Sequence, residues 1–235
     1  MQFPFGPLEP DATEMEPGVC LVANGVLPKR VGYGPAPSLS VGVTATPLPD
    51  APRGVVSVVL NDGTWKVYAY TADDVYELQS DDTWDSLGAS LAVTAGDDVC
   101  AMHFGNYLLF TNTTDGLISY NVETPAGFDS VVAAGDPRFI FTCANMVFGL
   151  DCKDGAGNRN NRLIRNSDFN SFTNWSTGAA DYQPLEDGGP LVAGFDLKDG
   201  AALILQERAV RLLQFGNAGG GALYSLRRVS DKLGS

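Results

Sequence analysis

The residues with the most evident chemical capacity are one histidine and several pairs of neighbouring carboxylates. His103 is the only histidine, and it lies at the end of an apolar run in the segment CAMHFGNY. No GxSxG motif or second histidine accompanies it, so we interpret His103 as a structural residue. The carboxylate pairs all fall in predicted turns, where aspartate is favoured for local hydrogen bonding: Asp73-Asp74, Asp81-Asp82 and Asp97-Asp98.

Oxygen and sulfur ligands are present, but they do not have the spacing of a metal site. Asp151, Asp154 and Asn158 offer oxygen atoms for calcium, yet the loop does not match the EF-hand pattern. The four cysteines are scattered without a CxxC pair, which favours free buried thiols over disulfides or zinc: Cys20, Cys100, Cys143 and Cys152. We therefore predict no catalytic residue, no bound metal and no cofactor.

Two Thr-Trp pairs resemble the Asp-box turns of sialidase-type propellers. They occur in NDGTW and SDDTW, but the first lacks the residue that separates Asp from Gly, and the second has no Gly. Such boxes are structural turns, and Asn-Asp-Gly is a good hairpin turn. Trp65 and Trp84 are therefore expected to pack across strands or between neighbouring sheets.

The elements that must position these residues are short strands. From residue 55 onward, apolar runs alternate with turn residues, and four cycles begin near residues 55, 99, 138 and 191. The third cycle is expected to end in a segment through Trp175, and residues 203–215 to form two strands that turn at Glu207-Arg208. A repeat of about 40–50 residues with four strands is typical of a β-propeller blade.

These patterns predict an all-β chain of β-propeller-like, four-stranded antiparallel blades. We assign residues 51–235 to a domain of about four blades and residues 1–50 to an extended, Pro-rich N-terminal arm. No apolar run approaches the roughly 20 residues of a membrane span. The N-terminus lacks a basic and an apolar region, so we predict no secretory signal and no membrane-spanning segment.

The charge of the chain is acidic and unevenly distributed. The net charge is −13; residues 1–160 hold 20 acidic and 7 basic side chains, and residues 161–235 hold 8 of each. An acidic protein is not attracted to nucleic acid or anionic membrane by ordinary electrostatics. The charge therefore indicates either simple solubility or a surface to which DNA must not adhere.

The N-terminal arm resembles the first segment of the head-to-tail proteins of short-tailed bacteriophages. The matching features are the Pro10-Asp11 pair, Ala23-Asn24 before Pro28, and the Gly32–Pro35 run that leads to Pro37-Ser38-Leu39. Residues before proline favour extended backbone, so the arm is expected to lie across a neighbour, with Tyr33 and Leu39 as anchors.

A second stretch, residues 161–215, resembles a blade of the same tail hub, nozzle and DNA-stabilisation proteins. The matching residues run from an arginine-bearing strand to a Gly-Gly hairpin and a Leu-rich strand: Arg162, Ser167-Asp168, Trp175, Gly188-Gly189, Gly200, Leu203–Leu205 and Glu207. Members of this family usually continue further, so the native chain is expected to extend past Ser235.

The resemblance implies a structural, non-enzymatic virion protein at the head-to-tail junction or tail nozzle, made in the cytoplasm of the host bacterium. Its implied partners are further copies of itself, usually in a hexamer, the portal, the adaptor and other tail proteins. Genomic DNA would pass through the channel without sequence-specific binding, and packaged DNA would be retained. Acids that we predict to line this lumen are Asp73, Asp74, Asp97 and Asp98. Two alternatives remain: a receptor-binding or adhesion propeller of the phage tail, and a glycan-hydrolysing, sialidase-like propeller.

Overall fold

The computed structural model describes residues 26–28, 33–35, 47–94, 97, 99–218 and 222–230. The chain divides into two compact units, Met1–Val43 and Thr44–Ser235. In the first unit, the described residues form two short antiparallel strands, β1 (Val26–Pro28) and β2 (Tyr33–Pro35). Most of the predicted arm lies outside the described residues, Leu39 included, so its extended conformation stays a prediction.

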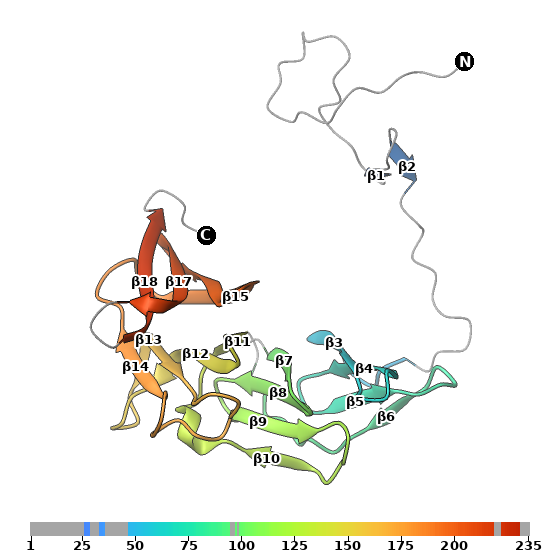
Figure 1. Ribbon diagram of the computed structural model, residues 1–235. Helices are drawn as coiled ribbons and strands as arrows, with labels where there is room; N and C mark the ends of the chain where they lie inside the picture. The colour runs from blue at the N-terminus through green and yellow to red at the C-terminus, as the bar shows by residue number, and fades with distance from the viewer. Residues whose placement is uncertain are drawn as a thin grey trace, which may run out of the picture. The chain divides into compact units, whose positions relative to one another are not determined.

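Four antiparallel sheets of four strands each form the second unit (Figure 1). The first sheet contains β3 (Gly54–Val59), β4 (Trp65–Tyr70), β5 (Val75–Leu78) and β6 (Trp84–Ser86). The second contains β7 (Cys100–Phe104), β8 (Tyr107–Asn112), β9 (Gly116–Asn121) and β10 (Phe128–Ser130). The third contains β11 (Phe139–Cys143), β12 (Met146–Lys153), β13 (Arg159–Asn166) and β14 (Asp181–Pro184). The fourth contains β15 (Leu191–Lys198), β16 (Ala201–Gln206), β17 (Ala209–Ala218) and β18 (Ala222–Ser230).

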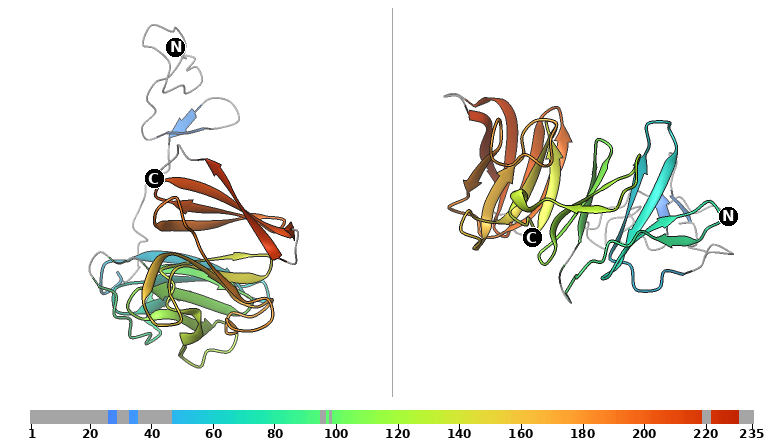
Figure 2. Two further views of the ribbon diagram at one scale, coloured as in Figure 1. Left: turned by 90° about the vertical axis from the view of Figure 1, so that its left-hand side faces the viewer. Right: turned by 90° about the horizontal axis from the view of Figure 1, so that it is seen from below.

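Each sheet is a meander in which every strand pairs with its neighbours in sequence. The sheets follow one another in chain order, with the first and fourth at opposite ends of the row (Figure 2). This arrangement confirms the prediction of an all-β chain with repeated, β-propeller-like blades. Among the described residues there is no α-helix, and no helix is long and apolar enough to cross a membrane.

Alternation along the strands explains how the sheets stack, because successive side chains point to opposite faces. Leu108 of β8 belongs to the apolar cluster between the first and second sheets, whereas Leu109 belongs to the cluster between the second and third. Val147 and Phe148 of β12 repeat this division, since Val147 faces the second sheet and Phe148 the fourth. The middle sheets are thus apolar on both faces.

Three apolar clusters hold the row together, one at each junction between consecutive sheets. Between the first and second sheets, Tyr68 and Tyr70 meet Phe110 and Tyr120 in edge-to-face contacts. Between the third and fourth, the Phe148 ring contacts Tyr224 edge to face, at 5.6 Å between centroids. Such pairs contribute about 0.5–1.5 kcal/mol beyond the burial of their area.

The hairpin predicted within residues 203–215 is confirmed. β16 ends at Gln206, β17 begins at Ala209, and the turn lies at Glu207-Arg208. The last strand of the second sheet is short: β10 ends at Ser130, and a 3-10 turn, η1 (Val132–Ala134), follows.

The third sheet does not end as the sequence predicts, because its last strand is β14 and not the segment through Trp175. Residues 167–180 form a loop around the Asp168 carboxylate, which accepts hydrogen bonds from the backbone N–H groups of Phe169 and Ala179 at 2.9 and 2.8 Å. The Trp175 indole N–H donates to the Phe172 carbonyl at 2.6 Å, and the ring is buried against the second sheet. In residues 167–180, these hydrogen bonds and contacts take the place of the strand pairing that the sequence predicts.

Both tryptophans of the Thr-Trp pairs lie in strands of the first sheet, opposite apolar residues. Trp65 lies opposite Val59, and Trp84 lies opposite Leu78. Packing between sheets was the other possibility, and Trp65 does not take it: its side chain is 68% exposed.

Candidate functional site

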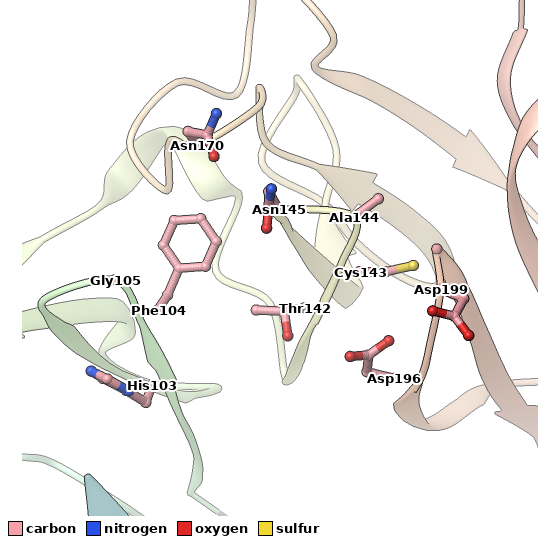
Figure 3. A pocket seen from close by; sticks show the side chains of 11 residues that line it. His103, Phe104, Gly105, Thr142, Cys143, Ala144, Asn145, Asn170, Asp196 and Asp199 are labelled. Atoms are coloured by element: carbon pink, nitrogen blue, oxygen red, sulfur yellow. The ribbon is translucent and has the colours of Figure 1, made fainter. Parts of the chain in front are cut away.

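A cavity of about 540 Å³ lies where the first hairpins of the second, third and fourth sheets converge (Figure 3). It is lined by residues near the ends of β7, β11 and β15, the first strands of their sheets, and by Asn170 from the loop after β13. The lining comprises His103, Phe104, Gly105, Thr142, Cys143, Ala144, Asn145, Asn170, Asp196, Asp199 and Gly200.

Tight turns with left-handed backbone shape the rim of this cavity. Ala144 and Asn145 have φ of 49° and 59°, and Asp199 and Gly200 have φ of 52° and 73°. Two successive residues with positive φ are characteristic of the two-residue turns that match the twist of a hairpin. The Asn170 N–H donates to the Asn145 carbonyl at 2.8 Å, so the loop after β13 fixes the turn between β11 and β12.

The thiol at the base of the cavity is a weak nucleophile. Cys143 is 1% exposed, and its sulfur points toward the side of the cavity that carries Asp199 (Figure 3). Burial, reinforced by the negative charge of Asp196, raises the pKa of the Cys143 thiol to about 11. The thiol is therefore protonated at neutral pH, and only the thiolate attacks substrates or binds metals effectively.

The described side chains that line the cavity carry negative charge. They include the acidic side chains of Asp196 and Asp199, and no lysine or arginine is among them. Loss of hydration lowers the pKa of His103 below its ordinary value of 6.5, so the imidazole is neutral at pH 7. Among the described side chains of this lining, an anion would therefore find none with a positive charge.

The acids predicted to line a lumen do not form one group. Asp73 is exposed in the turn between β4 and β5, and the half-buried Asp74 accepts N–H bonds from Val75 and Ala89 at 2.7 and 2.6 Å. Asp97 is 6% exposed, and its carboxylate accepts a hydrogen bond from the Thr113 N–H at 2.8 Å.

Of the other predicted site residues, only Tyr33 belongs to the described part of the chain. Asp98 and Leu39 are outside the described residues, and Tyr33 is part of β2. A role in a channel wall stays a prediction for Asp73, Asp74, Asp97 and Asp98; Asp74 and Asp97 also accept hydrogen bonds from nearby backbone N–H groups.

The oxygen atoms considered for calcium are engaged within the fold. The Asp151 carboxylate lies 3.3 Å from the Arg159 guanidinium, and Asp154 accepts the N–H groups of Ala156 and Asn158, each at 2.9 Å. Within the described ranges, no cluster of three or more acidic, histidine or cysteine side chains is arranged to hold a metal. Of the four cysteines, Cys100, Cys143 and Cys152 are free thiols, while Cys20 falls outside those ranges.

The sequence did not single out Asp196, Asp199, Thr142 or Asn145 as neighbours. The signal that could have found them is the position of the turn after the first strand of each cycle. In stacked repeats, equivalent turns lie side by side, so Gly105, Asn145 and Asp199 are expected at one rim once the repeat is known.

Comparisons with known proteins identify no family for this chain. No protein-family model matches the chain, and a search of curated proteins found no significant match. Among solved structures, the chain is similar to the crystal structure of the N-terminal domain of Nup159, with a TM-score of 0.43 and 10% sequence identity. The similarity covers 70% of this chain and 45% of that one, so the chain spans less than half of that domain.

Proposed function

We propose that this chain is a structural protein of a short-tailed phage virion that lines a channel for genomic DNA at the head-to-tail junction or tail nozzle. The observation that carries the proposal is the acidic lining where the first strands of three sheets converge, which has two aspartates and no lysine or arginine among its described side chains. The resemblance of residues 5–40 and 161–215 to the tail hub and nozzle proteins supports it.

The electrostatics favour passage of DNA over its capture. A protein that binds DNA gains affinity by placing lysine and arginine on phosphates and releasing counterions. Here the lining carries Asp196 and Asp199 and a neutral His103, and the whole chain has a net charge of −13. Repulsion over about 10 Å at 0.1 M salt would keep a duplex away from such a wall.

The pKa values of the titratable groups in the cavity also favour a structural role over an enzymatic one. The Cys143 thiol has a pKa raised to about 11, and the pKa of His103 is lowered. A thiol–imidazole nucleophile needs the opposite change, a thiol pKa depressed by a neighbouring positive charge.

The proposal is tested in phage particles that encode this chain. We expect mass spectrometry of purified virions to detect it, and a particle reconstruction to place several copies around the axis between portal and tail tip. Absence of the chain from particles would overturn the proposal. A position at the distal tail, together with glycan binding by the purified protein, would favour the receptor-binding alternative, and glycan cleavage would favour the sialidase-like one.

DNA binding by the purified chain gives an independent test. We expect fluorescence anisotropy of a labelled 30-base-pair duplex to detect weak binding at most, with no steep loss of affinity between 50 and 200 mM salt. A protein with six to ten phosphate contacts would lose about 10³–10⁵ in affinity over that range. Tight, salt-sensitive binding would contradict a repulsive wall.

A further inference from the structure

The last two strands of the third sheet, β13 and β14, form the floor of another cavity, with a volume of about 390 Å³. Ile164 of β13 packs toward the fourth sheet, so its neighbours Leu163 and Arg165, which line the cavity, point to the side of the second sheet. The strand register places Pro184 opposite Leu163 and Tyr182 opposite Arg165. The volume falls within the range of small-molecule sites.

The Arg165 guanidinium has no acidic partner among the described residues. None of their ion pairs includes it. Its side-chain hydrogen bond within the described part of the chain runs from Nη2 to the Trp175 carbonyl at 3.4 Å, longer than the usual distance of about 2.7–3.2 Å. Because a guanidinium offers five N–H donors, most of them remain available to a further acceptor.

The other charged groups on the cavity lining already have partners. The Lys153 Nζ lies 2.5 Å from a carboxylate oxygen of Asp136. The Asp154 carboxylate accepts the N–H groups of Ala156 and Asn158, each at 2.9 Å, within its own exposed turn at the rim. Arg165 is therefore the cation of this lining whose charge is left uncompensated by a described residue, and burial of an unpaired charge is unfavourable.

Gly135 makes room for this guanidinium. A Cβ at position 135 would lie 2.3 Å from Nη1 of Arg165 and 2.7 Å from the Lys153 carbonyl. The backbone of the residue that follows η1 thus lies against one edge of the guanidinium and restricts its movement. A cation held in place before a ligand arrives loses less conformational entropy when the ligand binds.

We propose that this cavity binds a small organic carboxylate, whose charged group pairs with Arg165 and whose apolar part lies on Leu163, Pro184 and Tyr182. The planar guanidinium matches a carboxylate through two parallel hydrogen bonds. Leu163 is 3% exposed and provides an apolar floor, whereas Tyr182 is 67% exposed and can cover a planar group.

The charge of the site selects the class of anion. One uncompensated guanidinium balances the single negative charge of a carboxylate, whereas a phosphate dianion would also have to approach the Asp154 carboxylate at the rim. The inference does not rest on the proposed function, because the cavity lies on β13 and β14 and shares no residue with the lining formed by the first strands.

Heteronuclear NMR titration of the full chain with phenylacetate tests the proposal. We expect saturable shifts of the Gly155, Ala156 and Tyr182 amide signals, with a Kd of about 1 mM or lower for so small a ligand. Phenylacetamide has the same shape without the charge, so it should bind at least about tenfold more weakly. Inorganic phosphate, which has no apolar part, should also bind more weakly than phenylacetate.

Variants of β13 identify the group that binds the carboxylate. Arg165→Met should weaken phenylacetate binding at least about tenfold, and Arg165→Lys should recover part of the loss, because it restores the charge without the planar fork. Arg162→Met is the matched control: Arg162 is an exposed arginine of the same strand, points to the other side of the sheet and donates to the Glu186 carbonyl at 3.0 Å. It should leave the Kd unchanged.

Tyr182→Ser keeps the test decisive if Arg165→Met fails to fold. The exposed Tyr182 side chain can be removed without opening the core, and its loss should weaken phenylacetate binding about threefold, with circular dichroism to verify the fold. Absence of saturable shifts at about 20 mM phenylacetate would overturn the proposal. Equal affinity for phenylacetamide, tighter binding of phosphate, or equal effects of Arg162→Met and Arg165→Met would also overturn it.

Discussion

The Arg211 Nε donates a hydrogen bond of 2.6 Å to Oε1 of Gln206, across the hairpin between β16 and β17. The Gln206 side-chain amide in turn donates to the carbonyls of Asp187 and Gly189, each at 2.8 Å. Arg211 also pairs with the Asp187 carboxylate, which accepts a further hydrogen bond from Arg228 at 3.0 Å. This network fixes the turn that connects the third sheet to the fourth.

Arg211→Met should lower the free energy of unfolding by about 1–3 kcal/mol, because it removes the charged donor of Gln206 and one of the two charged donors of Asp187. Arg211 is 9% exposed, whereas Asp187 keeps contact with water, which limits the loss. Urea denaturation measures the change. Arg208→Met is the control: the Arg208 side chain is 75% exposed and should change stability by less than about 0.5 kcal/mol. Equal effects of the two variants would contradict a specific role for the network.

Gly194→Ala should disturb the junction between the third and fourth sheets. A Cβ at position 194 would collide with the ring of Phe141, so the ring or the strand must shift. Overpacking of this kind costs about 1–3 kcal/mol. Gly155→Ala is the matched control, since a Cβ there meets no atom within 4 Å. A thermal melt of both variants checks the difference, and Phe141→Leu should recover part of the loss in the Gly194→Ala background.

Ala144→Gly should stabilise the chain, although it removes a side chain. Ala144 has φ of 49°, a conformation that costs a residue with a Cβ about 1–2 kcal/mol and glycine almost nothing. After the larger loss of freedom in the unfolded chain is included, we expect a gain of about 0.5–1 kcal/mol. Ala101→Gly in the middle of β7 should instead destabilise by about 0.5–1 kcal/mol. Loss of stability in Ala144→Gly would show that the turn does not strain this residue.

Stability should fall at alkaline pH. Burial raises the pKa of the Cys143 thiol to about 11 and that of the Cys152 thiol to about 12, from an ordinary value of 9. Raised pKa values mean that the folded chain holds protons that the unfolded chain releases. The stabilisation is therefore complete below pH 9 and is lost as the pH rises through 11–12, at up to about 1.4 kcal/mol per pH unit for each thiol.

Cys152→Ala identifies the contribution of one thiol to this loss. Between pH 9 and pH 11, the decline in unfolding free energy should be about 2–3 kcal/mol smaller in the variant than in the parent chain. Denaturant titrations at pH 8, 9, 10 and 11 measure both curves. Parallel curves would mean that Cys152 ionises in the folded chain as it does in the unfolded one.

The strands and hairpins could be predicted from sequence because their determinants are local. Alternating apolar residues, together with a turn sequence such as Asn61-Asp62-Gly63, specify a hairpin without reference to the rest of the fold. The loop 167–180 could not, since its form depends on which N–H groups the Asp168 carboxylate accepts. A run that ends in a buried Trp175 looks like a strand until those hydrogen bonds are known.

The cavity is less accessible to sequence analysis than the strands. His103 and Asp199 are separated by almost one hundred residues, and they become neighbours only because three sheets stack in order. The net negative charge predicted that acidic residues contribute to function, but it did not indicate which aspartates line the cavity. Asp97 belongs to an obvious Asp-Asp pair, yet its carboxylate is buried beneath the Thr113 turn.

The division of the interior into three separate clusters has a consequence for how the molecule loses structure. Each sheet is stabilised only by its immediate neighbours, so the row behaves as a linear chain of coupled units. An isolated copy should therefore fray from its ends, with amide hydrogens of β4 and β17 exchanging before those of β8 and β12. A contact that covered the outer face of a terminal sheet would give that sheet the second neighbour that the middle sheets already have, and would convert gradual fraying into a single cooperative event.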